Sequence, residues 1–263
     1  MKNIPFVAEF YDRYRSPYPQ QLYEKLQFLC PPPTCTDVLD VGCGPGLATV
    51  ELSKHYDQVT GLDSSEEMIR YAESTINCRN VMWIYEEAEK LPFPNDSFDL
   101  LTCGEAFQLF RFEDFLGEAR RILRRNGRIA LFWPDRFTTN QDKRYERALF
   151  QTYRAFLKQQ GISDVQGVIP SKEGKQPEEV VVDFLTDSGF VGCEISYIEY
   201  SIQWTMLSLI GYMLTHSAIG SLNKDQLEQL KQEYHVRLTE TGFHDGFASQ
   251  ARVLLITGTT KAT

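Results

Sequence analysis

The feature of this chain that most limits its possible folds is a regular alternation of short apolar runs with amphipathic stretches. The apolar runs are rich in β-branched or aromatic residues and lie at residues 37–41, 58–63, 80–85, 98–103 and 127–133. Stretches of helical spacing lie between them, the clearest at 112 to about 125. Strands that alternate with helices predict a parallel sheet with right-handed crossovers and helices on both faces.

The rest of the chain adds two strands and two inserts. Strands are expected at 191–202 and 251–259, so we predict an α/β fold with a doubly wound, mostly parallel seven-stranded sheet. The second insert, 203 to about 248, has an entirely helical pattern. We expect one domain, 1–263, with a core and a helical cap. The core comprises about 35–135, 178–202 and 249–259, and the cap comprises about 1–25, 134–177 and 203–248.

Two helix ends carry recognisable signals. Ser64 precedes a helical stretch and Glu67 follows three residues later, which predicts a capping box. The basic run RRILRR at 120–125 lies where the helix that starts at 112 would end, and cations stabilise helix C-termini. We therefore interpret this run as structural rather than as a nucleic-acid site.

The segment VLDVGCGPG at 38–46 joins the first expected strand to the helix after it. Its glycines permit a sharp bend, a close approach of the backbone to a ligand, and tight packing of helix on strand. Asp63 follows about 20 residues later at the tip of the second strand, where a carboxylate suits the hydroxyls of a ribose. These features predict a nucleoside bound across the carboxyl ends of the strands.

The spacing within this segment distinguishes between nucleosides. Dinucleotide-binding loops have the pattern G-x-G-x-x-G, whereas this loop has G-x-G-x-G and is preceded by Asp40. A carboxylate at that position suits a cationic amino group and would repel a pyrophosphate. S-adenosyl-L-methionine (SAM) combines an amino-acid head, a ribose and an adenine, and we predict it as the cofactor.

Four ordered segments resemble the successive motifs of class I SAM-dependent methyltransferases. They are VLDVGCGPG, VTGLDSSEEMI, EEAEKLPFPNDSFDLLTCGEAF and EARRILRRNGRIALF. The resemblance is closest to the methyltransferase type 11 family of small-molecule enzymes and covers roughly residues 35 to 135. YDRYRSPYP and EAFQLF also resemble, more loosely, the trans-aconitate methyltransferase-like group. The resemblance implies a Rossmann-like methyltransferase fold and an enzyme that transfers a methyl group from SAM.

The resemblance also implies a set of cofactor contacts. The predicted cofactor-binding residues are Tyr11, Arg15, Asp40, Gly42, Cys43, Gly44, Gly46, Asp63, Ser64, Met68, Glu87, Ala88, Cys103, Gly104 and Glu105. Within this set Asp40 would lie near the ammonium group, Asp63 would hold the ribose and Arg15 would pair with the carboxylate. Glu87 would accept a hydrogen bond from the adenine amino group. At the preceding position this chain has Glu86 where the family usually has glycine.

The acceptor pocket is expected to be walled by the cap. Its candidate substrate-binding residues are Phe107, Gln108, Trp133 and His216. The family often has histidine where this chain has Gln108, so a general base is not expected there and the catalytic residues are left open. Methyl transfer from a sulfonium is an in-line displacement that depends mainly on alignment. We expect a small, partly apolar metabolite that is methylated on a carboxylate, amine, thiol or hydroxyl.

Composition limits the partners. The formal net charge of −9 disfavours nucleic acid, whose phosphates repel an acidic surface. The six cysteines include no C-x-x-C pair, so we expect no metal site, and reduced thiols fit a cytoplasmic protein. The apolar stretch at 204–220 is interrupted by polar residues, so we expect no membrane partner. The oligomeric state is left open.

Two other classes of function remain open. A methyltransferase of this type can act on a protein or an RNA instead of a metabolite. The same fold can also bind SAM as a sensor or subunit without turnover, because an intact glycine loop indicates binding and not catalysis.

Overall fold

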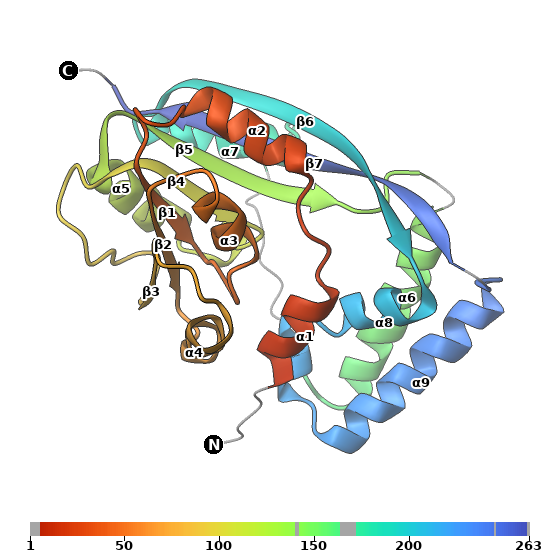
Figure 1. Cartoon of the computed structure of the whole chain (residues 1–263). Coiled ribbons are helices and arrows are strands. Elements are labelled where there is room, and N and C mark those ends of the chain that lie inside the picture. Colours follow the sequence, from red (N-terminus) through yellow and green to blue (C-terminus); the bar gives the residue numbers. More distant parts are fainter. Residues whose placement is uncertain (1–5, 140–141, 164–171, 245, 262–263) are drawn as a thin grey trace. The chain divides into compact units, whose positions relative to one another are not determined.

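A computed structural model describes residues 6–139, 142–163, 172–244 and 246–261 (Figure 1). The chain divides into two compact units. Unit 1 comprises Met1–Ser16, Asp135–Gln166 and Glu199–Arg252. Unit 2 comprises Pro17–Pro134, Gly167–Ile198 and Val253–Thr263.

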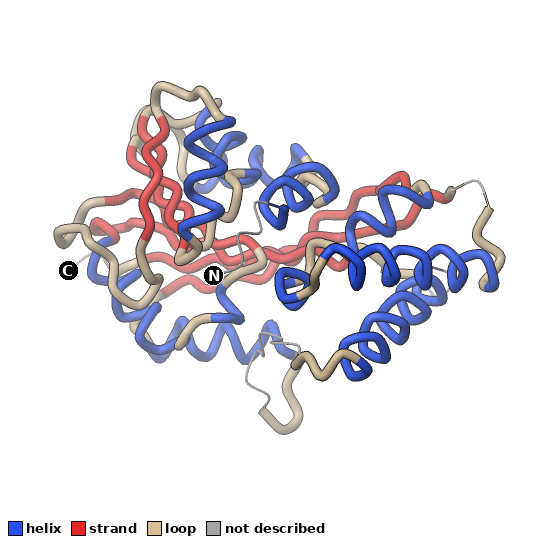
Figure 2. Tube along the Cα trace, turned by 90° about the horizontal axis from the view of Figure 1, so that it is seen from below, coloured by secondary structure: helices blue, strands red, loops and turns tan. Residues whose placement is uncertain are grey.

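Seven strands within the described residues form one twisted sheet, drawn in red in Figure 2, in the order β3-β2-β1-β4-β5-β7-β6. Their bounds are β1 Asp37–Val41, β2 Gln58–Asp63, β3 Val81–Tyr85, β4 Phe98–Gly104, β5 Leu123–Asp135, β6 Val191–Trp204 and β7 Phe247–Thr259. Strands β1 to β5 pair in parallel, whereas Figure 1 shows β7 running opposite to its neighbours β5 and β6. The predicted mostly parallel seven-stranded α/β sheet is confirmed.

The two faces of the sheet in unit 2 bury alternate residues of β1. Leu39 and Val41 belong to an apolar core shared with α5 (Phe112–Ile122) and α7 (Pro177–Asp187). Asp40 points to the opposite face, where it meets α3 (Leu47–Ser53). Side chains alternate along a strand, so a buried polar residue can sit between two apolar ones without entering the apolar core. Unit 2 also holds α2 (Gln20–Leu29), and α4 (Glu66–Thr75), which contacts β2 and β3.

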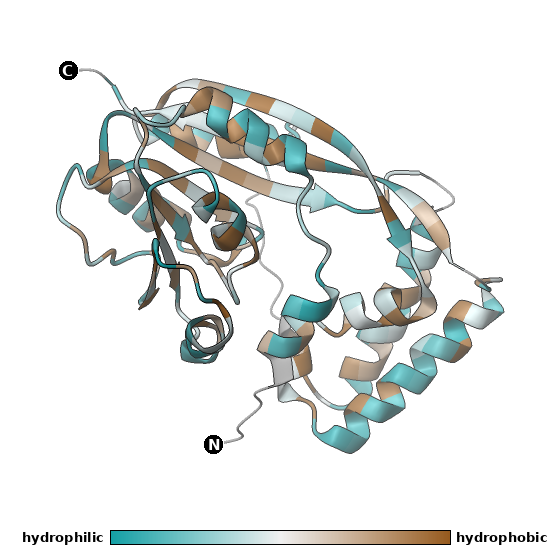
Figure 3. Cartoon of the chain, in the orientation of Figure 1, coloured by the Kyte–Doolittle hydropathy of each residue, from teal (hydrophilic) through white to brown (hydrophobic). Residues whose placement is uncertain are grey.

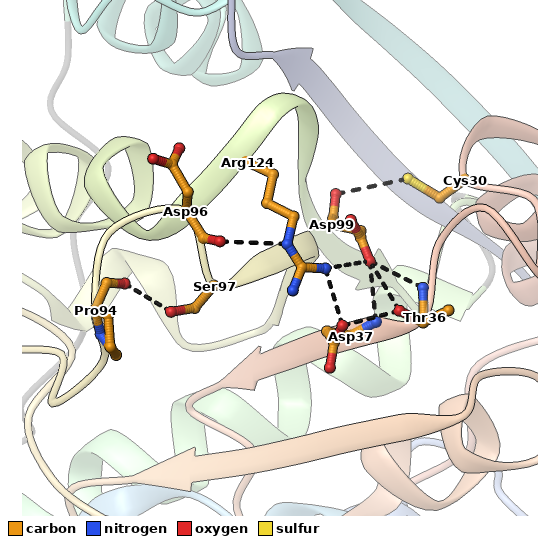
Figure 4. A network of polar contacts seen from close by, with 8 residues as sticks. All are labelled: Cys30, Thr36, Asp37, Pro94, Asp96, Ser97, Asp99 and Arg124. Carbon is orange, nitrogen blue, oxygen red and sulfur yellow. Dashed lines mark hydrogen bonds and ion pairs between the residues drawn. The ribbon is translucent and has the colours of Figure 1, made fainter.

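Helix α5 ends earlier than the sequence suggested. It stops at Ile122, and Arg124 lies in β5, so the interpretation of the whole run 120–125 as a helix end is wrong for its last residues. Arg124 instead donates through Nη1 to Asp37 at 2.9 Å and to Asp99 at 2.8 Å (Figure 4). The register between β4 and β5 is irregular at this point, and Arg124 faces the two carboxylates.

Helix α4 begins one residue later than predicted. Its N-cap is Ser65, whose Oγ accepts the N–H of Met68 at 3.4 Å, so the capping box at Ser64 and Glu67 is wrong. The cause lies in the preceding strand end, where the carboxylate of Asp63 accepts the N–H of Ser65 at 2.8 Å and fixes the turn.

Unit 1 is a helical cluster around its own apolar core. It contains α1 (Phe6–Tyr14), α6 (Asp142–Gln159), α8 (Met206–Met213), the short 3₁₀ helix η2 (Ser217–Ser221) and α9 (Lys224–Glu240). Helix α6 packs on α9, which buries Leu227, Leu230, Tyr234 and Leu238 on one side. Most of the rest of α9 is coloured as hydrophilic in Figure 3. Helix α1 packs on α8 so closely that a Cβ at Gly211 would overlap the ring of Tyr14.

Two boundaries of the inserts differ from the sequence analysis. The second insert is not entirely helical, because β6 continues to Trp204 and β7 begins at Phe247. Helix α2 belongs to unit 2, although residues up to about 25 were expected in the cap. None of the helices in the described part of the chain is long and apolar enough to cross a membrane.

Candidate functional site

A cavity of about 280 Å³ lies in unit 2 at the carboxyl ends of adjacent parallel strands. Its lining residues are Gly42, Leu62, Asp63, Ser64, Glu87, Ala88, Glu89, Ala106, Leu109, Phe110 and Arg111. They lie at the end of β2 or in the loops that follow β1, β2, β3 and β4. Ligands of open α/β sheets bind at this edge, where the strand order reverses beside the first strand. The position makes this cavity the candidate binding site.

The glycine loop adopts backbone conformations that other residues avoid. Gly42 has φ +70° and a Cβ there would overlap the side chain of Ala106, so only glycine lets β1 turn beneath the loop that follows β4. Gly44 has φ +55°, donates its N–H to Asp63 at 2.8 Å, and has no atom within 4 Å of the place where a Cβ would stand. The loop therefore leaves open space beside its backbone.

Asp63 joins the end of β2 to this loop. Its two carboxylate oxygens accept the N–H groups of Gly44 and Ser65, each at 2.8 Å. Burial raises the pKa of Asp63, and these two hydrogen bonds act against that rise. Each carboxylate oxygen has a second acceptor site, so the group that orders the loop can also bind a hydroxyl in the cavity.

Asp40 lies beneath the loop rather than on the cavity wall. It is 1 % exposed, and its oxygens accept the hydroxyls of Thr49 at 2.7 Å and Thr102 at 2.8 Å. Burial raises its pKa to about 6, the two hydroxyl hydrogen bonds lower it, and the nearby charge of Asp63 raises it further. The predicted contact with an ammonium group stays a prediction. The structure shows a buried carboxylate that is costly to keep ionised.

Two loops form the opposite walls of the cavity. Glu87, Ala88 and Glu89 follow β3, and the segment that contributes Leu109, Phe110 and Arg111 follows β4. Glu87 and Ala88 were predicted for the adenine. The other four were not assigned to the cofactor, because sequence spacing alone does not show which loops face each other.

The residues at and after the end of β4 are held by contacts within the protein. Cys103 is fully buried, and Phe107 packs in the core against Trp133. Gln108 donates its amide to the carbonyl of Glu105 at 2.9 Å, which braces the turn at φ +55°. Cys103 as a cofactor contact, and Phe107, Gln108 and Trp133 as substrate contacts, stay predictions.

The remaining loop contacts include one residue that the sequence analysis missed. The Tyr18 hydroxyl donates to the Glu105 carboxylate at 3.4 Å, and the Tyr18 ring meets Phe132 edge-on. A Cβ at Gly104 would crowd both Phe132 and Tyr18, which explains the glycine there. Tyr18 lies in the segment YDRYRSPYP, from which only Tyr11 and Arg15 were assigned to the cofactor.

Three predicted residues belong to unit 1. Arg15 donates to Thr215 at 2.9 Å, and its guanidinium lies 5.0 Å from the ring centroid of Tyr11 and 5.2 Å from that of Tyr212. His216 donates through Nδ1 to the backbone carbonyl of Met213 at 3.0 Å, and its ring packs against Tyr212. Tyr11 and Arg15 as cofactor contacts, and His216 as a substrate contact, stay predictions.

The structure thus collects part of the predicted set. Gly42, Asp63, Ser64, Glu87 and Ala88 meet in one cavity. The other predicted cofactor residues of the same unit do not line the cavity; they are Asp40, Cys43, Gly44, Gly46, Met68, Cys103, Gly104 and Glu105. Among the described residues, no group of three or more His, Cys, Asp or Glu side chains is arranged to hold a metal ion.

A glycine loop after β1, an acidic residue at the end of β2 and this strand order define an α/β protein of the Rossmann-like class. Residues 39–131 match the family model described as a methyltransferase domain. This segment is what the chain shares with the class I methyltransferases of type 11.

Two relatives in sequence are also named as methyltransferases. A provisionally named methyltransferase of Dictyostelium discoideum is 31% identical over 56% of this chain and 56% of its own length. A demethylmenaquinone methyltransferase of Staphylococcus aureus is 39% identical over 36% of this chain and 41% of its own length. The chain thus spans about half the length of these curated relatives.

Solved structures extend the likeness in fold to nearly the whole chain. YcgJ of Bacillus subtilis has a TM-score of 0.56 at 20% identity over 92% of this chain and all of YcgJ. A phosphoethanolamine N-methyltransferase of Haemonchus contortus, solved with S-adenosylhomocysteine, has a TM-score of 0.57 at 14% identity over 97% of this chain and 57% of its own. The [4+2]-cyclase SpnF has a TM-score of 0.54 at 14% identity over 95% of this chain and 85% of its own.

Proposed function

We propose that this protein transfers a methyl group from SAM to a small, partly apolar metabolite. The observation that carries the proposal is the cavity between the glycine loop and Asp63 on one side and Glu87 and Ala88 on the other. A ribose needs acceptors for its two hydroxyls, and an adenine needs a flat slot with an acceptor for its amino group. The carboxylates of Asp63 and Glu87, both on the cavity wall, support these two roles.

The residues present fit this cofactor. Gly44 leaves open space beside the loop backbone, where the amino-acid portion can lie. Asp63 is held in place by two backbone amides, so its remaining acceptor sites are oriented before a ribose arrives. Asp40, buried under the loop and hydrogen-bonded by two hydroxyls, supplies negative charge close to a cationic head.

SAM supplies both the methyl group and its leaving group. In the proposed transfer, the acceptor atom would supply the electron pair of the new bond to the methyl carbon. The bonding pair of the broken carbon–sulfur bond would stay on sulfur, which gives S-adenosylhomocysteine. The protein contributes alignment and exclusion of water rather than an acid or base. A carboxylate, amine or thiol acceptor suits a site in which Gln108 is bonded to the Glu105 backbone.

The acceptor and compartment belong to the same proposal. The net charge of −9 supports a metabolite over an RNA, and the free thiols of all six cysteines support the cytoplasm. The demethylmenaquinone methyltransferase among the relatives is consistent with a partly apolar acceptor.

Calorimetry and label transfer test the proposal. We expect the full chain to bind SAM and S-adenosylhomocysteine, and to pass labelled methyl to a metabolite extract rather than to protein or RNA pools. Asp63→Ala should abolish binding, whereas Glu66→Ala, which removes an exposed carboxylate one turn away, should leave binding unchanged. Binding of NADH but not of SAM would overturn the proposal.

A second candidate is a protein that binds SAM without transferring its methyl group. The likeness to SpnF, a protein named as a [4+2]-cyclase, favours keeping this candidate, because the same fold carries that name. Tight binding of SAM with no label in any of the three pools would favour it over methyl transfer.

A further inference from the structure

The two loops that wall the cavity are tied together by one carboxylate. Glu89, in the loop after β3, accepts the backbone N–H of Arg111 through Oε1 at 2.7 Å. The Arg111 guanidinium lies 4.0 Å from the same oxygen, and the Glu89 side chain is only 11% exposed. Both residues line the cavity. The link therefore lies on the cavity wall and joins its two sides.

The start of α5 explains why a carboxylate is needed there. Arg111 is the N-cap residue of α5, and its side chain makes no capping bond. The first N–H groups of a helix have no partner within the helix, and the positive end of the helix dipole favours a negative group nearby. Glu89 meets both requirements from outside the helix.

A second set of contacts holds the same loop further along α5. Glu118 accepts the N–H of Leu91 at 2.9 Å, and Arg121 donates to the carbonyls of Leu91 at 2.9 Å and Phe93 at 2.7 Å. At its other end the loop is anchored by the N–H of Glu86, which donates to the carbonyl of Asp63 at 3.1 Å. Loss of Glu89 would therefore release the cavity end while the rest of the loop stays attached.

We propose that Glu89 is a positioning residue that fixes the spacing between Ala88 and the segment Leu109–Arg111 and thereby sets the affinity for the nucleoside half of the ligand. The inference rests on the proposed function, since it takes an adenosine-containing ligand as the occupant. Glu89 acts through the Arg111 backbone, so its effect depends on one hydrogen bond and not on the charge of the Arg111 side chain.

Two pairs of variants break this bond from opposite ends. Glu89→Ala removes the acceptor, and Glu89→Gln keeps an oxygen that can accept the same N–H. Arg111→Pro removes the donor, and Arg111→Ala keeps it. Proline fits at 111, because Arg111 has φ −70° and the preceding Phe110 is extended at φ −88° and ψ 158°. Glu113→Ala is the control, since it removes an acidic group from the first turn of α5 at an exposed position.

The readout is the Kd of S-adenosylhomocysteine and of 5′-methylthioadenosine, which lacks the amino-acid head. We expect Glu89→Ala and Arg111→Pro to raise both Kd values by about tenfold, a change of about 1.4 kcal/mol that lies within the usual worth of a hydrogen bond to a charged group. Glu113→Ala, at an exposed position that does not line the cavity, should stay within about twofold of the parent. Glu89→Gln and Arg111→Ala keep the hydrogen bond and should each raise the Kd values less than Glu89→Ala and Arg111→Pro do.

The outcomes separate this inference from the proposed function. If the parent protein binds neither ligand, the proposed function fails. If the parent binds and Glu89→Ala or Arg111→Pro binds equally well, the inference alone fails. It also fails if Arg111→Ala loses as much as Arg111→Pro, or if only S-adenosylhomocysteine is weakened. Should Glu89→Ala not fold, Arg111→Pro against Arg111→Ala gives the same comparison.

Discussion

Asp40→Asn should stabilise the protein and abolish binding of its cofactor. Asp40 is 1 % exposed and has a pKa raised from 3.8 to about 6, chiefly by burial. A rise of about 2 pKa units corresponds to about 3 kcal/mol, which is the cost of keeping this carboxylate ionised in the fold relative to the unfolded chain. Asparagine has the same shape and no charge, so it avoids that cost.

The neighbouring groups can accept the new amide. The amide oxygen of the introduced asparagine would accept the Thr49 hydroxyl as Asp40 does at 2.7 Å. The amide NH₂ would donate to Thr102, whose hydroxyl then turns to the Leu39 carbonyl, 3.5 Å away in the present structure. With its hydrogen bonds kept, the variant gains up to about 3 kcal/mol above pH 7.

The pH dependence has a defined sign. The folded protein binds the Asp40 proton more tightly than the unfolded chain, so the wild-type contribution is most favourable below 3.8 and is lost as pH rises through about 6. The advantage of Asp40→Asn should therefore be near zero at about pH 3.5 and largest above about pH 7.

Denaturant unfolding at several pH values, with calorimetry for SAM, measures both effects. A variant that is less stable than the wild type above pH 7, or whose gain is the same at every pH, would refute the reasoning about burial. A stable variant that still binds SAM with unchanged affinity would refute the role of Asp40 in binding.

Three further substitutions test the fold around the site. Partial burial raises the pKa of Asp99, but hydrogen bonds from two backbone amides and from Arg124 outweigh it and lower the pKa, so its stabilisation is lost as pH falls below the unfolded value of 3.8. Asp99→Asn should cost about 1–3 kcal/mol in urea unfolding at pH 7 and flatten the loss of stability in acid. Gly42→Ala, at φ +70° and against Ala106, should cost about 2 kcal/mol or more and weaken SAM binding in calorimetry. Gly117→Ala, exposed in α5 with no atom within 4 Å of the new Cβ, should instead add about 1 kcal/mol by the same unfolding assay.

Local pattern was sufficient wherever one physical cause acts within a short stretch. The strands at 37–41 and 58–63 were predicted to the residue. A short run of β-branched and apolar residues is typical of a strand that is buried on both faces of a parallel sheet. The bend at Gly42 and Gly44 was predictable, because glycine is the residue that adopts a positive φ most readily.

The errors in the sequence analysis arose where a side-chain contact decides the local structure. Asp63 captures the N–H of Ser65 and moves the start of α4 by one residue. Arg124 leaves the helix pattern because two carboxylates on other strands hold it in β5. In both cases the deciding contact is a polar one that the spacing of the apolar residues does not reveal.

The sequence by itself determined the α/β class, the loop that bends after the first strand, and the acids at 40 and 63. Each depends on the chemistry of a single residue or on a short repeat. Only the tertiary structure decided what those acids do. It buries Asp40 beneath the loop and leaves Asp63 on the cavity wall, although both follow similar apolar runs. It also brings Glu89 to Arg111 across the cavity, because facing loops are set by the order of strands in the sheet and not by the order of residues in the chain.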